Sequence, residues 1–127
     1  MLTRGIEAFV DEWECQPLLQ PAPHISAEQR AAQRAQRLNH QPIGLANSLR
    51  GMGAGQQAPL WPKLSGLQPP VTLIVGERDV RYREIAARMH GQLPASTLCI
   101  VPEAGHTVHL DQPQFFVELV TKFLTTN

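Results

Sequence analysis

Two polar residues that could move a proton follow directly on two short apolar runs of this sequence. Asp79 ends the stretch VTLIVGERD, and His106 ends the stretch CIVPEAGH. A carboxylate that contacts one nitrogen of an imidazole fixes the tautomer of the ring and stabilises its protonated form. The other nitrogen is then free to take a proton from a nucleophile. Asp79 and His106 are therefore candidates for the acid and the histidine of a catalytic site.

Each candidate also has an ordinary structural interpretation. Asp79 precedes a helical pattern that begins near Val80, a position where aspartate commonly caps the free amides of the first turn. His106 alone is compatible with a hydrogen-bonded loop histidine, and Glu77 is a second candidate for the acid. The occurrence of both residues at the ends of apolar runs, each followed by a helical pattern, favours the acid–base hypothesis over these alternatives.

The runs before Asp79 and His106 have the composition of buried strands. The stretches VTLIV and STLCIV are apolar and rich in β-branched residues, and the helical patterns REIAARMHGQL and QPQFFVELVTKFL follow them in turn. The order strand, helix, strand, helix predicts two parallel strands, which would place both residues on one rim, where such sheets bind ligands. Two strands alone leave apolar edges open, so further strands come from elsewhere or the chain is a piece of a larger domain.

Residues 1–66 read as helical throughout. The stretch GIEAFVDEWECQPLL has apolar residues at helical spacing and ends at prolines, and Ser26 with Gln29 forms a capping box for a second helix. A third helix is expected from about residue 42 to residue 50, before the glycines of RGMGAG. The second helix carries three arginines on one face, which is either solvated or covers a site: Arg30, Arg34 and Arg37.

Composition excludes several classes of protein. The chain has 127 residues, 43% of them hydrophobic and 17% charged, so it is not a disordered chain. Lys plus Arg and Asp plus Glu number 11 each, and a net charge of zero supplies no field for nucleic acid or an anionic membrane. No apolar run approaches the roughly 20 residues of a membrane span, and the start lacks the pattern of a signal peptide. The expected compartment is the cytoplasm.

Two further motifs have weak support as ligand sites. His106 and His109 form H-x-x-H, but no third ligand is obvious, and zinc usually takes three protein ligands or more. The stretch RGMGAG follows a helix rather than a strand, so it reads as a helix stop and not as a phosphate loop. We therefore expect neither a metal nor a nucleotide cofactor.

Several stretches of the chain resemble a known family. GERDVRYREIAARM, VPEAGHTVHLDQP and FFVELVTKFL resemble the last strands and helices of α/β-hydrolases. FVDEWE, QRLNH and SLRGMG resemble the lid region of the 2-succinyl-6-hydroxy-2,4-cyclohexadiene-1-carboxylate synthases of menaquinone and phylloquinone biosynthesis. The resemblance implies a partial α/β-hydrolase fold. Residues 1–66 would be a helical lid segment, and residues 67–127 would hold the last two parallel strands of the core and their helices.

The resemblance also implies an activity and roles for three residues. This family eliminates pyruvate from an intermediate that carries several carboxylates, and a triad serine acts as the base. By position, Asp79 matches the triad acid, His106 the triad histidine, and Arg37 an arginine that holds a substrate carboxylate. An arginine fork suits that task because it pairs bidentately with a carboxylate. The implied partner is a small-molecule carboxylate, with no cofactor, no nucleic acid and no membrane span.

One departure from the family pattern is large. The serines are Ser26, Ser48, Ser65 and Ser96, and none has the glycines two before and two after it that a nucleophile elbow requires. We therefore expect a C-terminal fragment that is inactive alone, for which an N-terminal half of the same enzyme is a candidate partner. The alternatives are a fragment of another α/β-hydrolase, such as an esterase or C–C hydrolase, and a non-catalytic assembly module. An arginine-rich pocket around Arg37 would favour the synthase, and an apolar pocket would favour the esterase.

Overall fold

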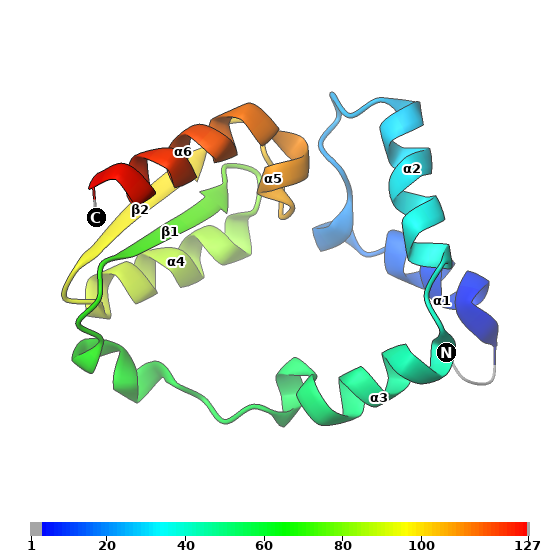
Figure 1. Cartoon of the computed structure of the whole chain (residues 1–127), viewed down its shortest axis with the longest axis horizontal. Helices are drawn as coiled ribbons and strands as arrows, with labels where there is room; N and C mark the ends of the chain where they lie inside the picture. Colours follow the sequence, from blue (N-terminus) through cyan, green and yellow to red (C-terminus); the bar gives the residue numbers. More distant parts are fainter. Residues whose placement is uncertain (1–3, 127) are drawn as a thin grey trace. The chain divides into compact units, whose positions relative to one another are not determined.

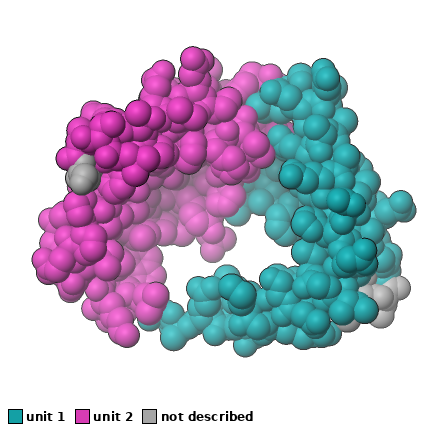
Figure 2. All heavy atoms as spheres, viewed as in Figure 1, with its two compact units in different colours: residues 1–19, 25–59 teal, residues 20–24, 60–127 magenta. Residues whose placement is uncertain are grey.

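The structure is a computed structural model that describes residues 4–126, and it divides into two compact units (Figures 1 and 2). The helical unit contains residues 1–19 and 25–59, and the sheet unit contains residues 20–24 and 60–127. The division between lid and core that the family resemblance implies, at residues 66 and 67, stays a prediction.

The helical unit contains three α-helices and two short 3₁₀ turns within residues 4–126: α1 (Gly5–Glu14), η1 (Pro17–Leu19), α2 (Ala27–Leu38), α3 (Pro42–Met52) and η2 (Ala54–Gln56). The predicted capping box of α2 is present, because Ser26 Oγ accepts from Gln29 N at 3.1 Å and Gln29 Oε1 accepts from Ser26 N at 3.0 Å. Pro42 occupies the start of α3, where its missing N–H costs no hydrogen bond, and Gly53 follows its end.

The sheet unit contains η3 (Trp61–Gly66), β1 (Val71–Gly76), α4 (Val80–Gln92), β2 (Ser96–Val101), α5 (Val108–Asp111) and α6 (Pro113–Thr126). Among these, β1, α4, β2 and α6 follow the predicted order of strand, helix, strand and helix. The strands are parallel, as predicted, and their register runs from Val71 opposite Ser96 to Gly76 opposite Val101. The short helix α5 lies between β2 and α6 and was not among the predicted elements. No helix within residues 4–126 has the length and apolar character that crossing a membrane requires.

The two faces of the sheet are covered by different helices (Figure 1). Leu73 and Val75 line a cavity with residues of α4, whereas Thr72 lines another with residues of α6. The core lies between the sheet and the C-terminal helices and contains Val101, Ala104, Val108, Ile74, Phe116 and Leu119.

The strands are less buried than their apolar sequences predict. Ile100 is 47% exposed, and the first four residues of β1 are only half-buried. The reason is the width of the sheet: within the described residues it has two strands, so each strand has a neighbour on one side only. The open edges that the sequence predicted are therefore present in this part of the chain.

Candidate active site

The loops that follow the two strands are joined by their backbones. Glu77 N donates to Val101 O and Arg78 N donates to Ala104 O, both at 2.9 Å. Gly76 allows this close approach, because a Cβ atom there would lie 2.1 Å from Gly105 O and 2.4 Å from Ala104 O. The end of β1 and the loop after β2 therefore pack backbone against backbone, which brings the residues that follow them together.

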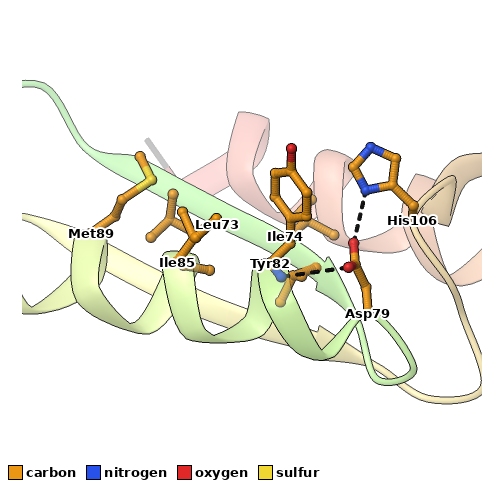
Figure 3. Close-up of a pocket in the computed structure, with 9 residues that line it drawn as sticks. Leu73, Ile74, Asp79, Tyr82, Ile85, Met89 and His106 are labelled. Atoms are coloured by element: carbon orange, nitrogen blue, oxygen red, sulfur yellow. Dashed lines mark hydrogen bonds and ion pairs between the residues drawn. The ribbon is translucent and has the colours of Figure 1, made fainter. Parts of the chain in front are cut away.

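Asp79 and His106 are in direct contact on this rim (Figure 3). Asp79 Oδ2 lies 2.8 Å from His106 Nδ1, and the side chain of Asp79 is 3% exposed while that of His106 is 33% exposed. An ionised carboxylate only accepts hydrogen bonds, so Nδ1 carries the proton and Nε2 of the neutral ring is left as an acceptor. The predicted proximity of the two residues is confirmed.

Asp79 is a helix cap as well as the partner of the histidine. Its Oδ1 atom accepts from Tyr82 N at 3.5 Å, at the start of α4. The cap and the contact with the histidine therefore coexist, one for each carboxylate oxygen. The cap fixes the carboxylate at the helix N-terminus and directs its second oxygen toward the imidazole.

Tyr82 is a second neighbour of His106 that the sequence analysis missed. The two ring centroids lie 4.7 Å apart with the planes tilted by 55°, a common arrangement for a pair of aromatic rings. In Figure 3 the tyrosine hydroxyl and Nε2 of the histidine both point away from Asp79. The sequence did contain a signal for this contact. Tyr82 stands three residues after the capping Asp79, which places its side chain in the first turn of α4.

Two other residues weighed from the sequence have different partners. Glu77 Oε2 accepts from Glu103 N at 2.9 Å, so this carboxylate supports the turn after β2, where Glu103 has a φ of 57°. The ring of His109 lies 5.9 Å from that of Phe116. Within residues 4–126 no group of three or more His, Cys, Asp or Glu side chains could hold a metal ion. Asp79, and not Glu77, is therefore the carboxylate placed against the histidine.

Asp79, Tyr82 and His106 lie at one end of a cavity of about 190 Å³ in the sheet unit. The rest of its lining is apolar and comes from β1 and α4: Leu73, Ile74, Val75, Ile85, Ala86 and Met89. A polar pair at the end of an apolar cavity can exchange a proton with a group held there, and the described lining contains no cationic side chain.

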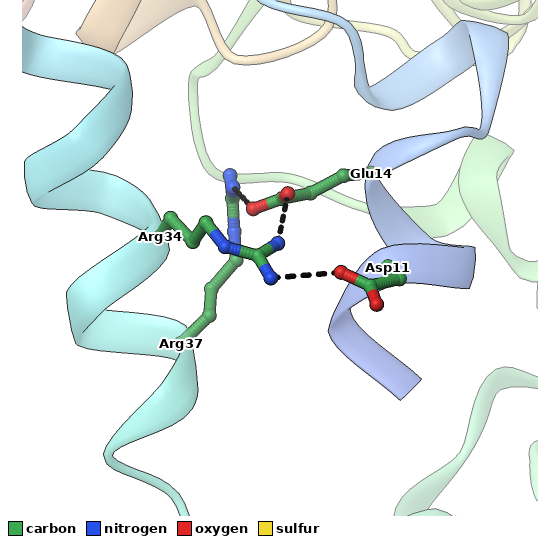
Figure 4. Close-up of polar contacts among 4 residues, drawn as sticks. All are labelled: Asp11, Glu14, Arg34 and Arg37. Atoms are coloured by element: carbon green, nitrogen blue, oxygen red, sulfur yellow. Dashed lines mark hydrogen bonds and ion pairs between the residues drawn. The ribbon is translucent and has the colours of Figure 1, made fainter. Parts of the chain in front are cut away.

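Arg37 lies in the helical unit, on α2, where it contacts an acidic residue of α1 (Figure 4). Its Nη1 donates to Glu14 Oε1 at 3.1 Å, and Arg34 donates to Glu14 Oε2 at 2.5 Å and to Asp11 Oδ1 at 2.7 Å. The hydrogen bonds to Asp11 and then Glu14 raise the pKa of Arg34 above its ordinary value. The arginine face of α2 is thus partly used to join α2 to α1.

Arg37 also lines a cavity of about 140 Å³ within the helical unit. The other lining residues are Phe9, Val10, Trp13, His40 and Leu45. Arg37 therefore combines a cationic group with an apolar surround. Since Asp79 and His106 belong to the other unit, a role of Arg37 at their site stays a prediction.

The sequence and fold together define the class of protein. The chain belongs to the alpha/beta hydrolase family, whose sequence model matches residues 3–119. A Bacillus subtilis (strain 168) protein provisionally named 2-succinyl-6-hydroxy-2,4-cyclohexadiene-1-carboxylate synthase is 44% identical over 126 residues, which are 99% of this chain and 46% of that protein. Protein PHYLLO of Arabidopsis thaliana is 33% identical over 137 residues, which cover 98% of this chain and 8% of that protein.

A solved structure agrees with these relatives. MenH from S. aureus superimposes with a TM-score of 0.91 at 34% identity, over 96% of this chain and 46% of that one. The chain therefore spans about half the length of the bacterial relatives it matches. The α/β-hydrolase fold implied by the sequence motifs is confirmed as a partial one, with two parallel strands and their helices.

Proposed function

We propose that this chain supplies the triad acid, Asp79, and the triad histidine, His106, to a 2-succinyl-6-hydroxy-2,4-cyclohexadiene-1-carboxylate synthase of menaquinone or phylloquinone biosynthesis. The observation that carries the proposal is the 2.8 Å contact between Asp79 Oδ2 and His106 Nδ1 at the ends of adjacent parallel strands. The identity of 44% to the Bacillus protein supports the choice of this family over others with the same fold.

In this proposal the two residues work on a serine that the rest of the protein contributes. His106 Nε2 accepts the serine proton, and Asp79 holds the ring in the required tautomer and stabilises the imidazolium that forms. The serine oxygen then removes a proton from a substrate carbon, the electrons of that C–H bond form a carbon–carbon double bond, and the C–O bond to the enol-pyruvyl group breaks. The departing enolate takes up a proton and becomes pyruvate, so the reaction is that of a carbon–oxygen lyase. No cofactor is needed for these steps, and we place them in the cytoplasm.

Arg37 is proposed to bind a carboxylate of the substrate, with residues 1–66 serving as the lid. Its contact with Glu14 Oε1 orients the guanidinium at the edge of the cavity that it lines. A guanidinium has five N–H donors, so one hydrogen bond to Glu14 is compatible with a bidentate contact to a ligand. The apolar residues around it suit the carbon skeleton of such a ligand.

A chimaeric enzyme tests the proposal. The matching 126 residues of the Bacillus protein would be replaced by this chain, and pyruvate release would be measured beside the unaltered Bacillus protein. We expect comparable turnover from the chimaera and none from this chain alone, because the serine and the oxyanion donors lie outside it. A folded chimaera without turnover, next to an active parent, would contradict the assignment, and so would turnover by the purified chain.

One observation favours a second candidate, an esterase of the same fold. The cavity beside His106 is lined by apolar residues of β1 and α4 apart from Asp79, Tyr82 and His106 itself. The same chimaera assayed with short-chain aryl esters distinguishes the two, since an esterase would release the alcohol and leave the pyruvate-bearing substrate unchanged.

A further inference from the structure

A second buried carboxylate lies close to His106 and has no part in the proton transfer described above. Asp111, at the end of α5, is 3% exposed. Its Oδ2 accepts from Gly105 N at 2.8 Å, and its Oδ1 accepts from Ala22 N at 3.3 Å. Burying a carboxylate is costly unless hydrogen bonds or charges compensate for lost hydration. These two hydrogen bonds compensate for the burial of Asp111 next to the loop that carries His106.

The two donors to Asp111 are backbone amides, and one of them belongs to the residue directly before His106. Hydrogen bonds to an ionised carboxylate are about twice as strong as those between neutral groups. On its other side the same peptide segment packs against Gly76, where an added Cβ would lie 2.1 Å from Gly105 O. Gly105 is therefore held between Asp111 and β1, and the direction in which the chain enters His106 is determined from both sides.

Asp111 also ties a distant segment to this loop. Residues 20–24 belong to the sheet unit, although they precede it in sequence by about forty positions. Ala22 N donates to the carboxylate, and His24 Nε2 lies within hydrogen-bond distance of the backbone oxygen of Asp111. Since a carbonyl oxygen only accepts, His24 carries its proton on Nε2, the opposite nitrogen to that in His106.

We infer that Asp111 is a positioning residue for His106: its carboxylate orients the Gly105 peptide so that Nδ1 of the imidazole meets Asp79. The inference rests on the proposed role of His106 in proton transfer, but its geometry can be tested without that reaction. A purely structural Asp111 would lower the stability of the sheet unit and leave the contact between Asp79 and His106 intact in the folded molecules. A positioning Asp111 would change the state of the His106 ring itself.

The tautomer of His106 is the readout that separates these two cases. Nitrogen-15 NMR of the imidazole rings in the whole chain reports which nitrogen carries the proton. In the wild-type chain we expect the proton of His106 on Nδ1 and that of His24 on Nε2, so His24 is an internal reference. The test variants are Asp111→Asn and Asp111→Ala. The asparagine keeps the shape but turns a donor toward one of the two amides.

The matched control is the adjacent substitution Gln112→Ala. Gln112 Nε2 donates to Pro102 O at 3.2 Å, so it also joins the helical end of the chain to the loop after β2, but away from Gly105. In the Asp111 variants we expect the ratio of Nδ1–H to Nε2–H forms of His106 to fall roughly tenfold or more, the effect of losing a hydrogen bond to a charged group. Gln112→Ala and the His24 signal should stay as in the wild-type chain.

The outcomes are distinct. Folded Asp111 variants with an unchanged His106 tautomer would overturn the inference. If neither variant folds, hydrogen exchange of the Gly105 amide in the wild-type chain decides. Protection as strong as that of the strand amides supports the inference that Asp111 holds the Gly105 peptide. Free exchange of this amide overturns it. A chimaeric enzyme without turnover would refute the proposed synthase and leave this positional result standing, so the two failures cannot be confused.

Discussion

Gly76 offers the sharpest test of how the site is assembled. In Gly76→Ala the new Cβ would lie 2.1 Å from Gly105 O and 2.4 Å from Ala104 O, so the loops must separate by more than about 1 Å to reach ordinary van der Waals contact. That movement strains the core by about 1–3 kcal/mol and weakens two backbone hydrogen bonds worth about 1 kcal/mol each. We expect a total loss of about 3–5 kcal/mol in the free energy of unfolding.

Urea unfolding followed by far-UV circular dichroism measures this loss. The free energy of unfolding falls by about 1–3 kcal/mol per molar urea, so the midpoint should fall by roughly 1–5 M or the folded baseline should disappear. Gly91→Ala is the matched control, because Gly91 lies in α4 and a Cβ there meets nothing within 4 Å. That change should stabilise α4 by about 1 kcal/mol, because alanine favours a helix more than glycine does. Equal midpoints for the two alanine variants would refute the reasoning about the loop contact.

Three further predictions concern Asp79, Arg37 and the cap of α2. In the chimaeric enzyme, Asp79→Asn should lower kcat by about 10⁴, as expected when the histidine loses its tautomer, with little change in KM; an equal loss through KM would contradict this role. Arg37→Ala should raise KM for the carboxylate substrate, and Arg37→Lys should not restore it, because lysine lacks the bidentate fork. The control Arg30→Ala, on the same helix, should leave KM unchanged. Ser26→Ala should cost α2 about 1 kcal/mol by removing its cap, measured by hydrogen exchange of the α2 amides, whereas Ser48→Ala on exposed α3 should cost far less.

The sheet unit could be predicted from sequence because its signals are local and agree with one another. Apolar β-branched runs, amphipathic helices and their alternation define β1, α4, β2 and α6, and parallel pairing follows from that order. The contact of Asp79 with His106 then follows, since residues at the ends of neighbouring parallel strands share one rim. The capping box of α2 was equally readable, because it depends on two residues three positions apart.

Contacts between distant residues that do not follow from the order of the strands could not be predicted from the sequence. Asp111 stands two positions before Pro113 at the start of α6, where an acidic residue looks like part of a helix start, and its burial depends on Ala22 from far along the chain. The link between Arg37 and Glu14 likewise requires α1 and α2 to be packed together first. Sequence periodicity reports the faces of single elements, and it contains no information on which polar groups meet across them.

Contacts within the sheet unit hold His106 and Asp79 together. Gly76, the backbone bonds of residues 77 and 78, and Asp111 restrain the pair from residues within or packed against the βαβ segment. Holding the carboxylate and the imidazole face to face costs side-chain conformational entropy. This cost is incurred when the sheet unit folds, and not when a substrate or a nucleophile arrives. Under the proposed function, the rest of the protein then supplies the hydroxyl that faces Nε2 of His106, together with the oxyanion donors.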